Sequence, residues 1–213
     1  LDAPTIRNLE LVRNLRDGKV KDTLLDVIDL TVTAPGGRLL RSWLLRPLFD
    51  VKEIALRQDG VAEALDATIG RRELREVLKG VLDLERLVGK IALAAAHPRD
   101  LVALKRSLAP LPHVQRELGA FAAAVFKAMS GRWDNAEDVA ALIDRAVLDE
   151  PAFLLTEGGI IKDGYNAELD DLRSVSRSGK SFIAQLERRE RDRTGIGSLK
   201  VRYNKVFGYY IEV

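Results

Sequence analysis

The 213 residues contain 34 basic and 32 acidic side chains, which gives a formal net charge of +2. This balance excludes a protein that coats nucleic acid through its overall charge, so any phosphate contact must come from a local cluster. The sequence has no cysteine, which excludes disulfides and thiolate metal sites and is typical of a reducing compartment. No apolar run approaches the roughly 20 residues of a membrane span. We therefore expect a cytoplasmic protein that does not contact a membrane.

The composition favours a helical fold. Hydrophobic residues make up 46% of the chain, which is enough for a sizeable core, while aromatic residues make up only 6%. Abundant leucine and alanine suit helix-on-helix packing better than a β-sandwich. The length fits one domain, or one domain with an appendage. The predicted fold class is mainly α: a helical core bundle, a long protruding helix and a small C-terminal β-hairpin.

The N-terminal third is predicted to begin with a helix. Thr5 is a plausible N-cap for this helix, which ends at Asp17-Gly18. Residues 34–37 (APGG) are predicted to form a turn, and residues 38–46 a helix that Pro47 ends. We expect Trp43 and Leu44 to be buried, because they lie on the apolar side of that helix.

Proline and aspartate positions indicate where the following helices begin. Asp50 is a predicted N-cap, and Pro98 occupies the first turn of a helix over residues 99–108. Further helices are predicted around residues 74–78 and 82–93, from 110 through 126, and over 133–147. The glycine-flanked residues 158–164 are predicted to form a turn or a brief strand pair. The core is therefore expected to be a single helical unit.

Residues 165–193 are predicted to form one long helix with a coiled-coil seam. Apolar and small residues recur alternately four and three positions apart, at Tyr165, Leu169, Leu172, Ser176, Gly179, Ile183 and Leu186. That alternation is a heptad pattern, which requires a second helix along it. At 1.5 Å per residue the helix is about 43 Å long, so we expect an arm that carries its tip far from the core.

The tip is predicted to be a β-hairpin. Polar and apolar residues alternate with a period of two along Leu199, Lys200, Val201, Arg202 and Tyr203, as expected of a half-exposed strand. Residues 204–207 are predicted to turn, and residues 208–213 to return as the second strand. Because the sequence stops within that strand, we expect the chain to be a piece of a larger protein.

The hairpin also carries a local cluster of cations. Lys200, Arg202 and Lys205, together with the amide of Asn204, are the candidate contacts to a DNA backbone, with no element that reads bases. Aromatic side chains at Tyr203, Phe207, Tyr209 and Tyr210 either pack the hairpin or stack on bases. Composition alone leaves a packed hairpin and a DNA-contacting hairpin equally supported.

No motif predicts catalysis. Ser178-Gly179-Lys180-Ser181 resembles the end of a phosphate-binding P-loop, but Ser174 stands where that motif requires glycine. His97 and His113 lie beside prolines, without partners at metal-ligand or triad spacing. The alternating charges of residues 187–193 indicate a solvated helix face. We expect no enzyme activity, no metal site and no cofactor in this chain.

Taken together, the segments resemble the middle region of the bacterial MutS proteins of DNA mismatch repair. The resemblance is carried in order by LDAPTIRNLEL (residues 1–11), GRLLRSWLLRPL (37–48), DLERL (83–87), PRDL (98–101), GYNAELD (164–170), RTGI (193–196) and LKVRYNKVFGYYIEV (199–213). It extends over the whole chain.

The resemblance implies a division into a helical core, or lever, domain at residues 1–164, an ascending lever helix at 165–193, and the start of the clamp domain at 194–213. In the family, lever helices connect an ATPase to DNA, and the clamp touches the DNA backbone without reading sequence. The implied partners are double-stranded DNA, a second MutS subunit and a MutL-type repair protein.

The resemblance also implies what lies elsewhere. The mismatch-reading Phe-x-Glu module and the ATPase, with its ATP and Mg²⁺, are expected outside this chain, as is the helix that fills the heptad seam. The alternative is a protein–protein scaffold, whose arm docks partner helices and whose tip does not meet nucleic acid.

Overall fold

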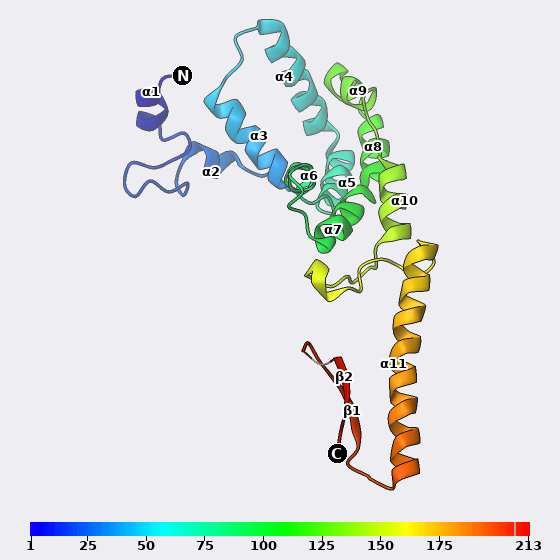
Figure 1. Ribbon diagram of the computed structural model, residues 1–213. Coiled ribbons are helices and arrows are strands. Elements are labelled where there is room, and N and C mark those ends of the chain that lie inside the picture. Colours follow the sequence, from blue (N-terminus) through cyan, green and yellow to red (C-terminus); the bar gives the residue numbers. More distant parts are fainter. Residues whose placement is uncertain (207) are drawn as a thin grey trace. The chain divides into compact units, whose positions relative to one another are not determined.

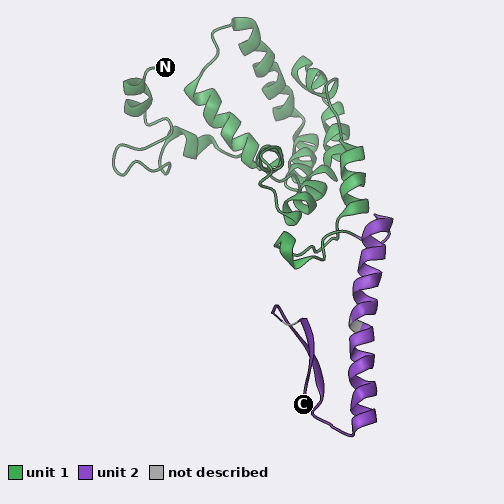
Figure 2. Ribbon diagram, in the orientation of Figure 1, with its two compact units in different colours: residues 1–161 green, residues 162–213 purple. Residues whose placement is uncertain are grey.

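The computed structural model describes residues 1–206 and 208–213, without the side chain of Lys180 (Figure 1). It is mainly helical and ends in a two-stranded antiparallel hairpin, which confirms the predicted fold class. The described chain forms two compact units, Leu1–Ile161 and Lys162–Val213 (Figure 2). Phe207, one of the four aromatic residues predicted at the tip, lies outside the described residues.

Unit 1 consists of short helices. They are α1 (Ala3–Asn8), α2 (Leu24–Ile28), α3 (Ala34–Leu45), α4 (Val51–Asp66), α5 (Thr68–Leu78), α6 (Leu84–Ala92), α7 (Pro98–Leu108), α8 (Leu111–Gly119), α9 (Ala124–Ser130) and α10 (Glu137–Ala146), with a 3-10 turn at Leu155–Glu157. An isolated antiparallel bridge pairs Val147 with Ile161, the brief strand contact expected around the glycine-flanked segment.

The main core of unit 1 is built around α7. Its buried members are Leu87, Val102, Leu104, Leu108, Leu111, Ile143, Ala146 and Val147. Ser107, also in α7, is fully buried, and its hydroxyl oxygen accepts a hydrogen bond of 3.1 Å from the backbone N–H of Leu82. At the edges of this core, Lys90 pairs with Asp100 at 2.6 Å, so that α6 is also tied to α7 by charge.

A second, smaller cluster lies near the N-terminus. Leu11, Val12 and Leu25 are buried there, and half-buried leucines of α3 pack against them. An exposed ionic contact joins α3 to α6: the guanidinium of Arg38 donates two hydrogen bonds of 2.7 Å to Asp83. Through this contact Arg38 lowers the pKa of Asp83 to about 2.

The first predicted helix is wrong in both its start and its length. Asp2, and not Thr5, caps α1 by accepting a hydrogen bond from the Thr5 N–H, and the helix ends at Asn8. Beyond it, the side chain of Asn14 accepts hydrogen bonds from the backbone N–H groups of Asp17 and Gly18. Local side-chain bonding therefore replaces the helix that the apolar spacing indicated.

The predicted turn at residues 34–37 is also wrong, because these residues form the first turn of α3. Thr33 caps the helix by accepting a hydrogen bond from the Gly36 N–H. Pro35 lies in the first turn, where its missing N–H would have had no acceptor within the helix. Trp43 is not buried: it is 41% exposed, and the guanidinium carbon of Arg57 lies 3.9 Å from its ring centroid. Leu44 is half-buried against the N-terminal cluster.

Two other boundaries differ from the prediction. The helix expected from 110 through 126 is divided into α8 and α9, because the N–H groups of Ala122 and Ala123 turn to donate to the carboxylate of Glu63. The helix expected from 133 begins only at Glu137, after Ala136 adopts a left-handed φ of 48°. The helices predicted after Asp50 and Pro98 are confirmed as α4 and α7.

Unit 2 consists of α11 (Ala167–Thr194), β1 (Lys200–Asn204) and β2 (Gly208–Glu212). The long helix is confirmed within two residues of the predicted bounds. Asn166 caps it by accepting from the Leu169 N–H at 2.9 Å, and Gly195 ends it with a φ of 70°, where a side chain would be strained. Leu172 in the predicted seam is 62% exposed, and among the described residues of unit 2 no second helix covers it.

Candidate nucleic-acid contact surface

The register of the hairpin places the predicted basic residues. Lys200 pairs with Glu212, Arg202 with Tyr210 and Asn204 with Gly208. Because alternate residues of a strand share a face, these six positions form one side of the hairpin, here called the cationic face. The predicted alternation of Lys200 and Arg202 along the strand is confirmed, whereas Asn204, expected to begin the turn, is the last residue of β1.

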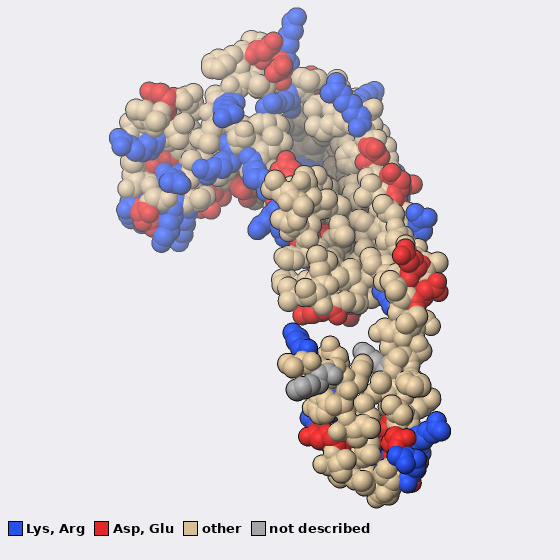
Figure 3. Space-filling view, in the orientation of Figure 1, with Lys and Arg blue, Asp and Glu red and all other residues tan. Residues whose placement is uncertain are grey.

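The cationic face also contains an acid. The guanidinium Nε of Arg202 lies 2.7 Å from a carboxylate oxygen of Glu212, and both side chains are about half exposed. Lys200 is exposed and directly opposite Glu212 in the strand register. In the space-filling view, basic and acidic side chains adjoin each other in unit 2 (Figure 3). The net positive charge of this face is therefore smaller than its cations alone suggest.

The turn that follows Asn204 holds the remaining predicted contact, Lys205. Lys205 is exposed there. The side-chain oxygen of Asn204 accepts a hydrogen bond of 2.9 Å from the backbone N–H of Val206. This bond is of the type that asparagine makes when it stabilises a turn. Asn204 thus shapes the turn that presents Lys205.

The aromatic side chains of the opposite face contact one another. The rings of Tyr203 and Tyr209, a cross-strand pair, lie with their centroids 5.1 Å apart at an interplanar angle of 61°. This edge-to-face contact supports the packed-hairpin interpretation. Both rings remain more than 60% exposed, so they also present surface to solvent.

The hairpin is bonded directly to the last turns of α11. One carboxylate oxygen of Glu187 accepts from the backbone N–H of Val201 at 3.0 Å, and the other from the guanidinium of Arg191 at 2.6 Å. Arg191 in turn donates two hydrogen bonds, of 2.8 and 3.2 Å, to the backbone oxygen of Leu199. Leu199 is only 3% exposed. We call Glu187, Arg191, Leu199 and Val201 the helix–hairpin junction.

Neither the junction nor the position of Glu212 beside the cations was predicted from the sequence. The charge pattern of residues 187–193 predicts a solvated helix face with i,i+4 ion pairs, and the pair of Glu187 with Arg191 confirms that pairing. Their spacing did not predict that the chain reverses after Gly195 and brings β1 back against α11. The position of Glu212 depends on how β2 pairs with β1, and the local sequence does not specify that register.

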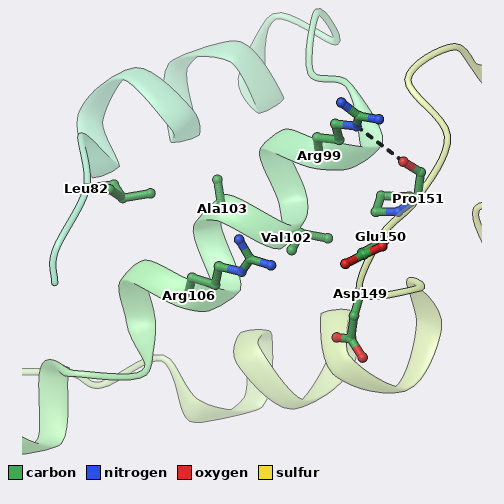
Figure 4. Close-up of a pocket in the computed structure, with 8 residues that line it drawn as sticks. All are labelled: Leu82, Arg99, Val102, Ala103, Arg106, Asp149, Glu150 and Pro151. Atoms are coloured by element: carbon green, nitrogen blue, oxygen red, sulfur yellow. Dashed lines mark hydrogen bonds between the residues drawn. The ribbon is translucent and has the colours of Figure 1, made fainter.

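Unit 1 contains a cavity of about 330 Å³ beside α7 (Figure 4). Its described lining combines an apolar side, including Val102, with the charged side chains of Arg99, Arg106 and Glu150. Arg99 is held at the rim, where its Nε donates to the backbone oxygen of Pro151 at 3.3 Å. Because basic and acidic groups both line it, the cavity does not favour a ligand of either charge.

The P-loop-like segment and the two histidines lie in surroundings that do not indicate catalysis. Ser178-Gly179-Lys180-Ser181 lies inside α11, so its backbone forms a helix and not a phosphate-binding loop. The ring of His97 stacks on Phe153 with a centroid distance of 4.9 Å, and His113 is exposed on α8. Within the described part of the chain, no group of three metal-binding side chains comes together. None of the described helices is long and apolar enough to cross a membrane.

The family model and the similar proteins that match this chain all point to the same family. Residues 4–201 match the family described as MutS domain III. Over its whole length the chain is 52% identical to the DNA mismatch repair protein MutS of Symbiobacterium thermophilum and 54% identical to that of Pelotomaculum thermopropionicum. It is 46% identical to the MutS of Methanothrix thermoacetophila. The chain spans about a quarter of the length of these relatives, 24% or 25% in each case.

Proposed function

This chain belongs to the MutS domain III family, and on that premise we propose that it is the lever and the start of the DNA clamp of a mismatch-repair protein. In this proposal the chain is not catalytic. Unit 1 and α11 are the lever, and the hairpin is the part that touches DNA. The contact is made to the phosphate backbone and is independent of base sequence.

The observation that carries the proposal is the combination of a cationic face with the helix–hairpin junction. Lys200, Arg202 and Lys205 are exposed and lie on or beside one face of a hairpin, a placement suited to phosphates rather than to the interior of a groove. Glu187 and Arg191 hold the backbone of Val201, in β1, and of Leu199, just before it, to α11. A displacement of α11 would therefore move the hairpin with it, as a lever requires.

The remaining parts of the proposal concern the longer protein. We infer that its ATPase, with bound ATP and Mg²⁺, lies outside this chain, and that the lever transmits the nucleotide state to the clamp. We also infer that the protein works in the cytoplasm as a dimer of MutS subunits and recruits a MutL-type partner. These inferences follow from membership of the family, and each is open to direct test.

Charge reversal at the hairpin tests the DNA contact. Lys200, Arg202 and Lys205 are changed together to glutamate in the intact protein that contains this chain, and binding to a labelled duplex is measured from about 50 to about 200 mM salt. The affinity is expected to fall, and the plot of log K against log salt to become shallower by about 0.9 for each phosphate that the variant no longer neutralises.

The matched control changes three exposed cations of unit 1, Lys52, Arg72 and Lys127, to glutamate. It alters the net charge equally and leaves the hairpin intact. If both triple variants bind DNA alike, the hairpin is not the contact. The protein–protein scaffold would then be the better account of the arm.

A further inference from the structure

The cationic face contains a carboxylate that can take the place of a phosphate beside Arg202. A carboxylate oxygen of Glu212 lies 2.7 Å from the Nε of Arg202, and the strand position of Glu212 lies directly across from Lys200. A guanidinium binds carboxylate and phosphate oxygens with the same planar donors. Two of the three candidate DNA-contacting cations are therefore paired with, or placed opposite, an acid of the same hairpin.

We propose that Glu212 is an internal competitor that limits the strength of DNA backbone contact by the hairpin. The inference rests on the proposed function and specifies which residue sets the affinity of that contact. For Arg202 to bind a phosphate, either the carboxylate must release the guanidinium or the two anions must lie close together. Both requirements weaken DNA binding.

The exposure of the pair determines the size of the effect. The side chains of Arg202 and Glu212 are 55% and 51% exposed. Ion pairs at such positions are weak, because water and salt screen them. Glu212 is therefore displaced readily when a phosphate approaches, and it adjusts the affinity without blocking the site. A contact of this kind suits a surface that must hold DNA without fixing its position.

The Glu212→Gln substitution tests the inference in the intact protein that contains this chain. Glutamine keeps the size and the hydrogen-bonding oxygen while removing the charge. Binding to a labelled duplex is measured by fluorescence anisotropy between about 50 and about 200 mM salt. Removing a half-exposed ion pair is expected to strengthen binding about two- to fivefold at the lowest salt. The log–log salt slope is expected to steepen by up to about 0.9, since the bound hairpin then has one more net positive charge with which to neutralise phosphate.

Glu190→Gln is the matched control. Glu190 also belongs to unit 2 and also pairs with an arginine, Arg193, at 2.7 Å, but it lies on α11. The control raises the net charge by the same amount without freeing a cation of the hairpin. Equal binding by the Glu212→Gln and Glu190→Gln variants would overturn the inference, because the effect would then be one of net charge.

Two further variants separate the inference from the proposed function. In an Arg202→Gln background, Glu212→Gln should give a smaller gain, since the guanidinium that it releases is absent. If reversal of Lys200, Arg202 and Lys205 weakens binding while Glu212→Gln does not strengthen it, the competitor is refuted and the DNA contact stands. If the reversed variant binds as the original protein does, the proposed function and the competitor both fail.

Discussion

The carboxylate of Glu187 on α11 accepts a hydrogen bond of 3.0 Å from the backbone N–H of Val201 on β1. This bond joins residues that are fourteen positions apart and belong to different elements. Because the partner on the strand is backbone, the bond holds β1 whatever side chain Val201 carries. The same carboxylate is held by Arg191, whose guanidinium also binds the Leu199 oxygen. The orientation of the hairpin on α11 therefore depends on one acid and one base of the helix.

Substitution of Glu187 by alanine is expected to loosen the hairpin without unfolding α11. The change leaves the Val201 N–H and the Arg191 guanidinium without their acceptor, and removal of such a partner costs about 1–3 kcal/mol locally. Hydrogen exchange at the Val201 amide should become faster, while amides in the middle of α11 should be little affected. In the matched variant Glu168→Ala, at the other end of the helix, exchange at Val201 should not change. Unaltered exchange in the Glu187 variant would show that the junction does not hold the strand.

Trp43 is expected to matter less for stability than its size suggests. Full truncation of a buried tryptophan costs about 3–5 kcal/mol, but Trp43 is 41% exposed and contacts the Arg57 guanidinium on one face. We expect Trp43→Ala to lower the free energy of unfolding by about 1–2 kcal/mol, because it removes buried apolar area and a cation–π interaction. Leu104→Ala in the main core, where Leu104 is 6% exposed, should cost about 2–5 kcal/mol. Urea unfolding of both variants shows which one loses more free energy of unfolding. A larger loss for Trp43→Ala than for Leu104→Ala would indicate that Trp43 is a core residue.

The contact between Arg38 and Asp83 predicts a loss of stability in acid. The pKa of Asp83 is lowered from 3.8 to about 2, so folding favours the ionised carboxylate. Its contribution is fully present above the unfolded value and disappears as the pH falls from about 4 toward 2. Thermal unfolding at pH 6 and pH 3 should show a smaller acid shift in Asp83→Asn than in the original chain. Equal shifts in the two proteins would mean that this contact makes no pH-dependent contribution.

The predicted seam of α11 should make the helix less protected than the core. Leu172 is 62% exposed, and Ser176 and Gly179 add little packing area at the centre of the seam. A helix that lacks a packed face gains little stability, and glycine costs about 1 kcal/mol relative to alanine. Amides of residues 174–193 should therefore exchange faster than those of α7 in a dilute solution of the chain. Gly179→Ala should slow this exchange, and protection equal to that of α7 would contradict the account.

The chain by itself should bind duplex DNA weakly or undetectably at physiological salt, and without preference for a mismatch. Its net charge is only +2, and one acid of the hairpin already pairs with one of the three candidate cations. Non-specific complexes with dissociation constants of about 10⁻⁴–10⁻⁶ M usually rest on more phosphate contacts. Titration of a homoduplex and a mismatched duplex side by side is the measurement. Micromolar binding that discriminates the mismatch would place mismatch reading within this chain.

The sequence predicted the elements with strong local signals and failed where side chains bond across a turn. The heptad spacing predicted α11, and the period-two alternation predicted β1. In contrast, the first helix was overextended, because apolar spacing cannot reveal that the Asn14 side chain accepts from Asp17 and Gly18.

The same reason explains what was missed at the candidate site. Alternation along one strand was enough to place Lys200 and Arg202 on a common face. The pairing of Arg202 with Glu212 depends on the register of a second strand. The bond from Val201 to Glu187 depends on the packing of β1 against α11. Neither contact leaves a signal in local sequence.

Site-specific photocrosslinking from the turn tests most directly whether the hairpin meets the DNA backbone. A photoreactive amino acid replaces Lys205 in the intact protein, and in a control it replaces Leu142, which is 46% exposed on α10. The account predicts crosslinks to DNA from position 205 that are well above those from position 142 and equal for homoduplexes of different sequence. Crosslinking from position 205 that is no greater than from position 142, or that depends on base sequence, would contradict a sequence-independent contact through this hairpin.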